Sequence, residues 1–178
     1  MCGIAGYIGN LSNFDFPRVI TTLAHRGPDS SGVFEDQAKR IGLVHTRLSI
    51  LDPSSLGHQP IASGDGQLVL VFNGEIYNFR ELRIELEQQG HQFLGDSDTE
   101  VLLNLYLDHR QTCDDVSPML RRLNGIFAFA IWDAVRGELL IARDALGVKP
   151  IYYSVDGQAF AFASEIKILL LINWRKST

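Results

Sequence analysis

The chain has 178 residues, of which 46% are hydrophobic, and it carries a formal net charge of −5 at pH 7. This length and composition allow one sizeable core, so we expect a single globular domain. The acidic balance and the lack of a clustered Lys/Arg run argue against nucleic-acid binding. No apolar stretch reaches the roughly 18 residues of a membrane span, and the start lacks the basic and apolar regions of a signal peptide. We therefore expect a cytoplasmic protein without a membrane segment.

Short apolar runs of strand length occur along most of the chain. They predict strands at Gly3 to Ile8, Gly32 to Phe34, Ile41 to Thr46, Gln67 to Phe72, Ile126 to Trp132, Glu138 to Ala142, Ile151 to Ser154 and Gln158 to Ala163. Amphipathic periodicity predicts helices at Pro17 to Ala24, Phe79 to Gln89 and Asp98 to His109. Turn residues at Arg136-Gly137 and Asp156-Gly157 favour antiparallel hairpins. Helices covering the outer faces of antiparallel sheets make a layered α+β sandwich, which is the predicted fold class.

The chain has two cysteines, and they require different explanations. Cys2 and Cys113 form no CxxC pair, so the sequence indicates neither a zinc site nor a disulfide framework. Cys113 lies in a polar stretch and is expected to be a surface or half-buried thiol. Cys2 follows Met1 and precedes Gly3, and a small second residue permits removal of the initiator methionine.

Removal of Met1 would leave Cys2 with a free α-amine. Such an amine has an unperturbed pKa of roughly 8, so it can take the thiol proton directly or through a water molecule. Nucleophile and base would then share one residue, and the thiolate would attack a carbonyl carbon. These residues alone leave open the alternative that Cys2 is a small apolar start to a strand.

Two polar connections, 25–32 and 142–150, are punctuated by glycine and proline. They contain Arg26, Asp29, Arg143 and Asp144. We expect these charged residues to pair with one another and to brace a site rather than to react.

Arg47 follows the apolar run that begins at Ile41. A guanidinium group can bind a carboxylate through two parallel hydrogen bonds, which a lysine cannot reproduce. Arg47 is therefore a candidate to hold the carboxylate of an amino-acid substrate. The alternative is a solvated arginine at the end of a strand.

Asn73-Gly74 follows the strand predicted at 67–72, and this dipeptide is the strongest short-range signal for a tight turn. From the dipeptide alone we expect a turn. The functional alternative is an oxyanion hole, in which the side-chain amide of Asn73 and the backbone N–H of Gly74 are the two donors. Glycine would then be required because a side chain would block the approach of the substrate.

The third predicted helix begins with an acidic segment. Ser97 and Glu100 have the spacing of a capping box, and Asp98 falls in the first turn. The Asp98 carboxylate can complement the helix dipole, or it can pair with the ammonium group of a bound amino acid, helped by Glu75. One carboxylate can do both.

Taken together, the order and spacing of these motifs resemble the glutaminase domain of class II glutamine amidotransferases, which are N-terminal nucleophile hydrolases. The resemblance covers Cys2 to about Leu170. It rests on the motifs MCGIAGYIG, HRGPDSSG, HTRLSILD, FNGEIYN, GDSDTE, LNGIFAFAIWD, ARDALGVKPIYY and FASEIK. The segments RLSI and NGEIYN resemble the asparagine synthetase branch in particular.

The resemblance implies a four-layer αββα sandwich with two antiparallel sheets, formed by residues 1–178 as one glutaminase domain. It implies that Cys2 is nucleophile and base, that Asn73 and Gly74 form the oxyanion hole, and that Arg47 holds the α-carboxylate of L-glutamine. The remaining implied glutamine-binding residues are Leu48, Ser49, Ile50, Leu51, Glu75 and Asp98. The implied reaction passes through a thioester of Cys2, yields glutamate and ammonia, and needs no metal or organic cofactor.

The family's C-terminal synthetase domain is not matched by this sequence. No nucleotide-binding motif follows Lys167, so ATP and Mg would belong to a missing domain or subunit that accepts the ammonia. A homodimer is compatible with this organisation. Three alternatives stay open: an N-terminal cysteine hydrolase acting on another amide, a carbohydrate-modifying amidotransferase, and a catalytically silent scaffold or dimerisation domain. The pair of Arg47 and Asp98 favours a free amino acid as substrate.

Overall fold

The computed structural model describes residues 1–11, 14–48 and 57–172. The described residues form two sheets in which every strand pair is antiparallel. The five-stranded sheet has the order β2 (Ser30–Asp36), β3 (Ile41–Arg47), β1 (Gly3–Ile8), β9 (Ala159–Ala163) and β8 (Tyr152–Asp156). The four-stranded sheet has the order β4 (Ile61–Ala62), β5 (Leu68–Ile76), β6 (Gly125–Asp133) and β7 (Glu138–Arg143).

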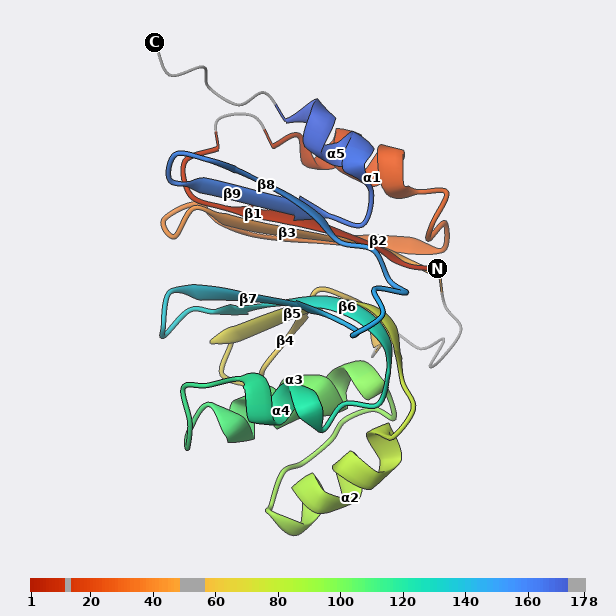
Figure 1. Ribbon diagram of the computed structural model, residues 1–178, viewed down its shortest axis with the longest axis vertical. Coiled ribbons are helices and arrows are strands. Elements are labelled where there is room, and N and C mark those ends of the chain that lie inside the picture. The colour runs from red at the N-terminus through yellow and green to blue at the C-terminus, as the bar shows by residue number, and fades with distance from the viewer. Residues whose placement is uncertain (12–13, 49–56, 173–178) are drawn as a thin grey trace.

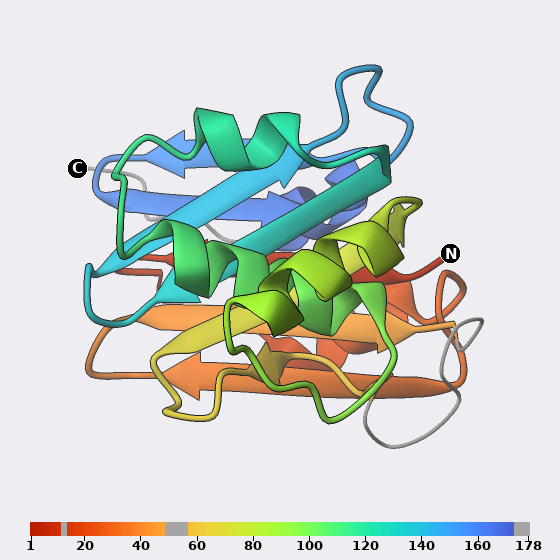
Figure 2. The ribbon, with the colours of Figure 1, turned by 90° about the horizontal axis from the view of Figure 1, so that it is seen from below.

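The helices lie on the outer faces of the two sheets (Figure 1). The five-stranded sheet is covered by α1 (Phe16–Leu23) and α5 (Ile166–Leu171). The four-stranded sheet is covered by α3 (Asp98–His109) and α4 (Ser117–Arg121), and α2 (Phe79–Gln88) packs against α3. Figure 2 shows these helices from below. The expected four-layer αββα sandwich with two antiparallel sheets is therefore confirmed.

The side-chain alternation of the strands explains how the two sheets pack. Ile41 and Leu43 of β3 point into the layer between the sheets, whereas Val44 points outward, toward α1 and α5. In β5, Val69 and Val71 enter the same inner layer. The buried inner layer consists of Ile4, Ile41, Leu43, Val69, Val71, Ala128, Ala130, Trp132 and Phe162.

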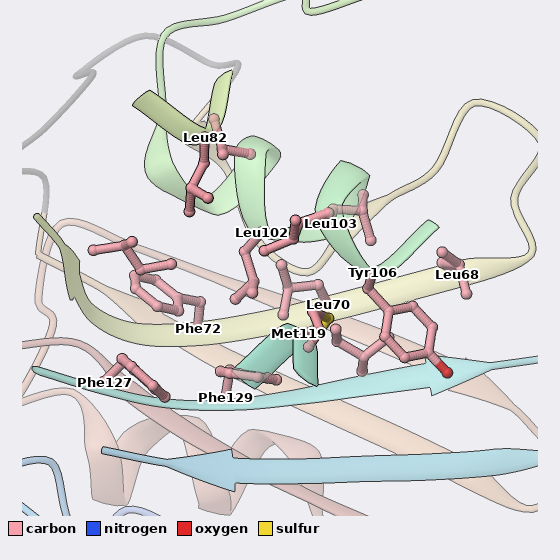
Figure 3. Close-up of a cluster of buried hydrophobic side chains, with 14 of the residues drawn as sticks. Leu68, Leu70, Phe72, Leu82, Leu102, Leu103, Tyr106, Met119, Phe127 and Phe129 are labelled. Carbon is pink, nitrogen blue, oxygen red and sulfur yellow. The ribbon is translucent and has the colours of Figure 1, made fainter. Parts of the chain in front are cut away.

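A second buried cluster joins the four-stranded sheet to its helices (Figure 3). Leu70 of β5 and Phe129 of β6 face Leu102 and Tyr106 of α3, and Leu82 adds a side chain from α2. These residues recur at helical spacing in α3 and at every second position in the strands, so each element buries one face. The cluster fixes α3, whose N-terminus carries Asp98.

Most of the elements predicted from the sequence are present. The predicted bounds of β1 and α3 are those observed, and both predicted hairpins form. Three short elements, β4, α4 and α5, were not predicted. They contain two, five and six residues, which is too few for hydrophobic periodicity to distinguish a strand from a helix.

The tight turn expected at Asn73-Gly74 is wrong. Both residues lie inside β5, where Asn73 pairs with Ala128 and Gly74 pairs with Phe127 of β6. A Cβ atom on Gly74 would lie 2.3 Å from the carbonyl oxygen of Ile126. Glycine is therefore required here because two strands approach closely, and the long β5–β6 ladder outweighs the turn preference of the dipeptide.

The buried cluster predicts a large effect of truncation at Leu70, whose exposed fraction is 0%. We expect Leu70→Ala to lower the free energy of unfolding by about 2–5 kcal/mol, because it removes buried methyl groups and leaves a cavity. Leu94→Ala is the matched control, since Leu94 is 85% exposed, and it should change stability by less than about 0.5 kcal/mol. Urea unfolding of both variants measures this, and equal effects would contradict the described packing.

Candidate active site

A cavity opens at one end of the layer between the sheets. Residues separated by an even number of positions on a strand point to the same face of the sheet. Asn73 and Glu75 therefore share the inner face with Val71 on β5, and Arg47 shares it with Leu43 on β3. Figure 1 places the N-terminus beside the same space. The cavity is lined by Met1, Cys2, Arg47, Leu48, Gly57, Gln59, Phe72, Asn73, Gly74, Glu75, Ser97, Asp98, Thr99, Ile126 and Lys149.

The structure brings most of the candidate site residues together in this cavity. Those that line it are Cys2, Arg47, Leu48, Asn73, Gly74, Glu75 and Asp98. Ser49, Ile50 and Leu51 lie outside the described residues. The candidate bracing residues Arg26, Asp29, Arg143 and Asp144 do not line the cavity.

Cys2 is held by contacts to both its thiol and its backbone. The N–H of Leu48 donates to the Sγ of Cys2 at 3.4 Å, and the thiol lies 3.7 Å from the Leu48 carbonyl oxygen. The Nε of Arg26 donates to the Cys2 carbonyl oxygen at 3.0 Å. Arg26 also pairs with Glu165, at 3.3 Å, so its charge is balanced within the fold.

Asp144 shapes the loop that follows β7. Its buried carboxylate accepts hydrogen bonds from the backbone N–H groups of Phe127, Leu146, Val148 and Lys149, at 2.9–3.3 Å. Burial acts to raise the pKa of this carboxyl, but the backbone donors outweigh burial and hold the pKa below its usual range. The loop is thereby fixed with Lys149 in the cavity.

The charged residues of the two polar connections do not pair as expected. Arg26 pairs with Glu165 instead, and Asp144 is satisfied by backbone N–H groups. The expected pairing is therefore wrong for Arg26 and Asp144, although Arg26 holds the Cys2 carbonyl and Asp144 holds the Lys149 loop. Sequence proximity of opposite charges could not show that a buried carboxylate would serve to cap its own loop.

Asn73 presents an unpaired donor. The residue is 1% exposed, and its Nδ2 has no hydrogen-bond partner among the described residues. Because buried amide groups are almost always paired, an unsatisfied donor at the cavity wall is available to the oxygen of a ligand.

Asp98 and Glu75 place two carboxylates at the cavity wall. The buried Asp98 carboxylate accepts from the backbone N–H of Ile76 at 3.0 Å. Burial raises the pKa of Asp98 above its usual value, and the charge of Glu75 adds to the rise. A cation placed between the two carboxylates would be stabilised.

The Ser97 hydroxyl caps α3 as expected. The Glu100 carboxylate does not complete the capping box, because it accepts hydrogen bonds from the backbone N–H groups of Leu94 and Gly95.

His45 lies behind the cavity and links the two sheets. It is fully buried, and its Nε2 lies 3.1 Å from the carbonyl oxygen of Phe72, the residue before Asn73. Since a carbonyl only accepts, Nε2 carries the proton and donates. Burial is the main cause that lowers the pKa of His45 from 6.5 to about 4, so the ring is neutral at pH 7.

Several residues of the site were not predicted from the sequence. Gln59 accepts from the backbone N–H of Phe72 at 2.6 Å and lies 3.5 Å from the Thr99 hydroxyl, so it joins β5 to α3. No local pattern marks Gln59. Lys149 lies in a segment interpreted only as a connection, although its charge between apolar neighbours was a signal that could have been used.

Comparison with known proteins assigns the family. The family model described as a glutamine amidotransferase domain matches residues 1–177, and the chain belongs to this family. The chain is 43% identical, over 178 residues, to asparagine synthetase [glutamine-hydrolyzing] 3 of Bacillus subtilis, covering 96% of this chain and 27% of that protein. It is 35% identical to the amidase chry2 of Gibberella zeae, covering 96% of this chain and 26% of that protein.

A solved structure confirms the fold. The glutamine phosphoribosylpyrophosphate amidotransferase of B. subtilis superposes with a TM-score of 0.74 at 24% identity, covering 96% of this chain and 43% of that chain. The chain spans about a quarter of the length of the curated relatives named above. The expected membership of the glutamine amidotransferases, with the N-terminal nucleophile hydrolase fold, is therefore confirmed.

Within residues 1–11, 14–48 and 57–172, no helix has the length and apolar character needed to cross a membrane. In the same part of the chain, no three His, Cys, Asp or Glu side chains gather in a way that could hold a metal ion.

The buried neutral His45 predicts a specific pH dependence of stability. The unfolded chain binds more protons than the folded chain between pH 6.5 and about 4. The contribution of the neutral His45 ring to the free energy of unfolding is therefore complete above pH 6.5 and is lost as the pH falls toward 4. The loss should be about 3 kcal/mol. In His45→Gln, the side-chain amide can replace the donor but does not titrate. Urea unfolding at several pH values should show a smaller acid loss in His45→Gln, and an unchanged loss would contradict this explanation.

Proposed function

We propose that this domain hydrolyses the side-chain amide of L-glutamine to glutamate and ammonia, with Cys2 as the nucleophile. The observation that carries the proposal is the unpaired, buried Nδ2 of Asn73 in the same cavity as the Cys2 thiol. Family membership supports the chemistry, because amide transfer from glutamine requires that the amide bond be broken.

The proposed reaction begins after removal of Met1. The α-amine of Cys2 takes the thiol proton, and the thiolate attacks the carboxamide carbon to form a C–S bond. The negative oxygen of the tetrahedral intermediate receives hydrogen bonds from the Asn73 side chain and the Gly74 backbone N–H. The C–N bond then breaks as the amine returns the proton to the leaving ammonia. Water attacks the thioester, the C–S bond breaks, and glutamate leaves.

Substrate selection would rest on charges at the cavity wall. Arg47 suits the α-carboxylate of glutamine, because a guanidinium group binds a carboxylate in a bidentate manner. Asp98 and Glu75 suit the α-ammonium group, whose charge would offset the repulsion that raises the pKa of Asp98. Leu48, together with Ser49, Ile50 and Leu51, is proposed to complete the glutamine site.

The use of the ammonia is a further part of the proposal. The name of the B. subtilis relative supports transfer to a synthetase that makes asparagine. The name of the G. zeae relative, an amidase, keeps another acceptor open. ATP and Mg would belong to that synthetase, and this domain would need no metal or organic cofactor. A cytoplasmic location and a homodimer stay predictions.

The first test of this function is Cys2→Ala. Because the variant lacks the only proposed nucleophile, it should release no glutamate or ammonia from glutamine, while circular dichroism shows an intact fold. Cys113→Ala is the matched control and should retain activity, since Cys113 does not line the cavity. Turnover by Cys2→Ala would exclude the proposed mechanism, and inactivity of the wild-type chain without Met1 would favour a silent domain.

Asn73→Ala tests the oxyanion hole. Loss of one donor typically lowers kcat by about 10²- to 10³-fold, because the hydrogen bond strengthens only as negative charge develops. The KM for glutamine should change much less than kcat. Asn10→Ala, on the exposed surface, is the control. A variant of Asn73 with full kcat would show that this amide does not contact the transition state.

Arg47→Lys tests carboxylate recognition. The variant keeps the positive charge but loses the bidentate geometry, so the KM for glutamine should rise by about tenfold or more with a smaller change in kcat. Arg18→Lys changes an exposed arginine in the same way and should leave KM unaltered. An unchanged KM in Arg47→Lys would argue for another carboxylate-binding residue.

A further inference from the structure

Lys149 is an unusual residue of the cavity. The residue is only 9% exposed, and buried lysines normally pair with a carboxylate. In the described part of the chain, the contact of its Nζ is with the Sδ of Met1, at 3.3 Å, and no ion pair involves it. A buried ammonium group therefore sits beside the residue whose removal would create the nucleophile.

The loop of Lys149 holds this charge in place. The backbone N–H of Lys149 donates to Asp144 at 3.1 Å, and Asp144 also accepts from Leu146 and Val148. Pro150 follows directly and restricts the backbone. The fold thus fixes the start of the lysine side chain rather than leaving it free to reach solvent.

We propose that Lys149 is a positioning residue for this reaction, because its ammonium charge holds the new α-amine of Cys2 in the neutral form that takes the thiol proton. The proposal rests on the function proposed above. It concerns a residue that neither contributes the nucleophile nor binds the ends of glutamine.

Covalent geometry limits the distance between the two groups. The Sδ of a methionine and the nitrogen of the next residue are separated by a short chain, so Lys149 Nζ lies within about 10 Å of the Cys2 nitrogen. At this distance, a positive charge opposes a second positive charge on the amine. The same charge favours the thiolate, so both effects promote the attacking form of Cys2.

Other charged residues near the N-terminus also act on the protonation of the Cys2 α-amine. They are Arg26 at the Cys2 carbonyl, Arg47 of β3, Glu75 of β5, Asp98 at the start of α3, and Glu165, which pairs with Arg26. Glu75 and Asp98 favour a protonated amine, and Lys149 opposes them. When glutamine binds, its ammonium group would offset these two carboxylates, whereas Lys149 would continue to act on the amine.

The experiment compares Lys149→Met, which removes the charge, with Lys149→Arg, which keeps it. Each chain is produced with Cys2 as its verified first residue, and kcat/KM for glutamine is measured between pH 5 and 10. In Lys149→Met, the acidic limb of the profile should move up by about one pH unit, so the loss of rate is about tenfold at the acidic end and small at high pH. Lys149→Arg should keep the wild-type limb. Lys39→Met removes one charge from the exposed surface and should also keep it.

A second measurement follows alkylation of Cys2 by iodoacetamide over the same pH range, located by peptide mapping. The alkylation profile should shift in the same direction in Lys149→Met. If Lys149→Met does not fold, Lys149→Gln replaces it. An unshifted limb in an active, folded, uncharged variant would overturn the proposal, as would equal shifts in Lys149→Met and Lys149→Arg. An inactive wild type whose Cys2 is not alkylated would instead overturn the proposed function.

Discussion

The cavity depends on the face-to-face packing of two antiparallel sheets. Because side chains alternate along a strand, each strand sends every second residue into the layer between the sheets. Apolar residues such as Ile4, Leu43 and Val71 close most of this layer. At one end, the same inner-facing positions are occupied by polar residues, including Arg47 and Asn73, so the layer becomes a binding site without any change of fold.

The polar groups at this end divide into those satisfied by the protein and those that are not. The Asp144 carboxylate is satisfied by backbone N–H groups and holds the Lys149 loop. Arg26 holds the Cys2 backbone, but its Nη2 has no hydrogen-bond partner in the described residues. The Nδ2 of Asn73 also lacks a partner in the described residues, and Asp98 lies buried beside a second negative charge. Such unsatisfied groups destabilise the protein alone and gain most from a ligand that complements them.

The sequence predicted the architecture well, because long strands and amphipathic helices are local features. Its candidate residues Cys2, Arg47 and Asn73 lie in one cavity, and their roles stay predictions. The turn at Asn73-Gly74 failed because the preference of a dipeptide is weaker than a long strand pairing. Gln59 and His45 could not be assigned, since their roles arise from contacts with Phe72 on a distant strand. The role proposed for Lys149 could not be predicted for the same reason, because it depends on a contact with Met1, far away in the chain.

The most direct test of the central claim is the reaction of the chain with a diazo-ketone analogue of glutamine, followed by intact mass measurement and peptide mapping. We expect a chain that begins at Cys2 to gain one adduct, located on Cys2, and we expect excess glutamine to prevent it. This result would establish the nucleophile and the class of substrate together. A chain that begins at Cys2 and stays unmodified, or whose modification is not blocked by glutamine, would contradict the account.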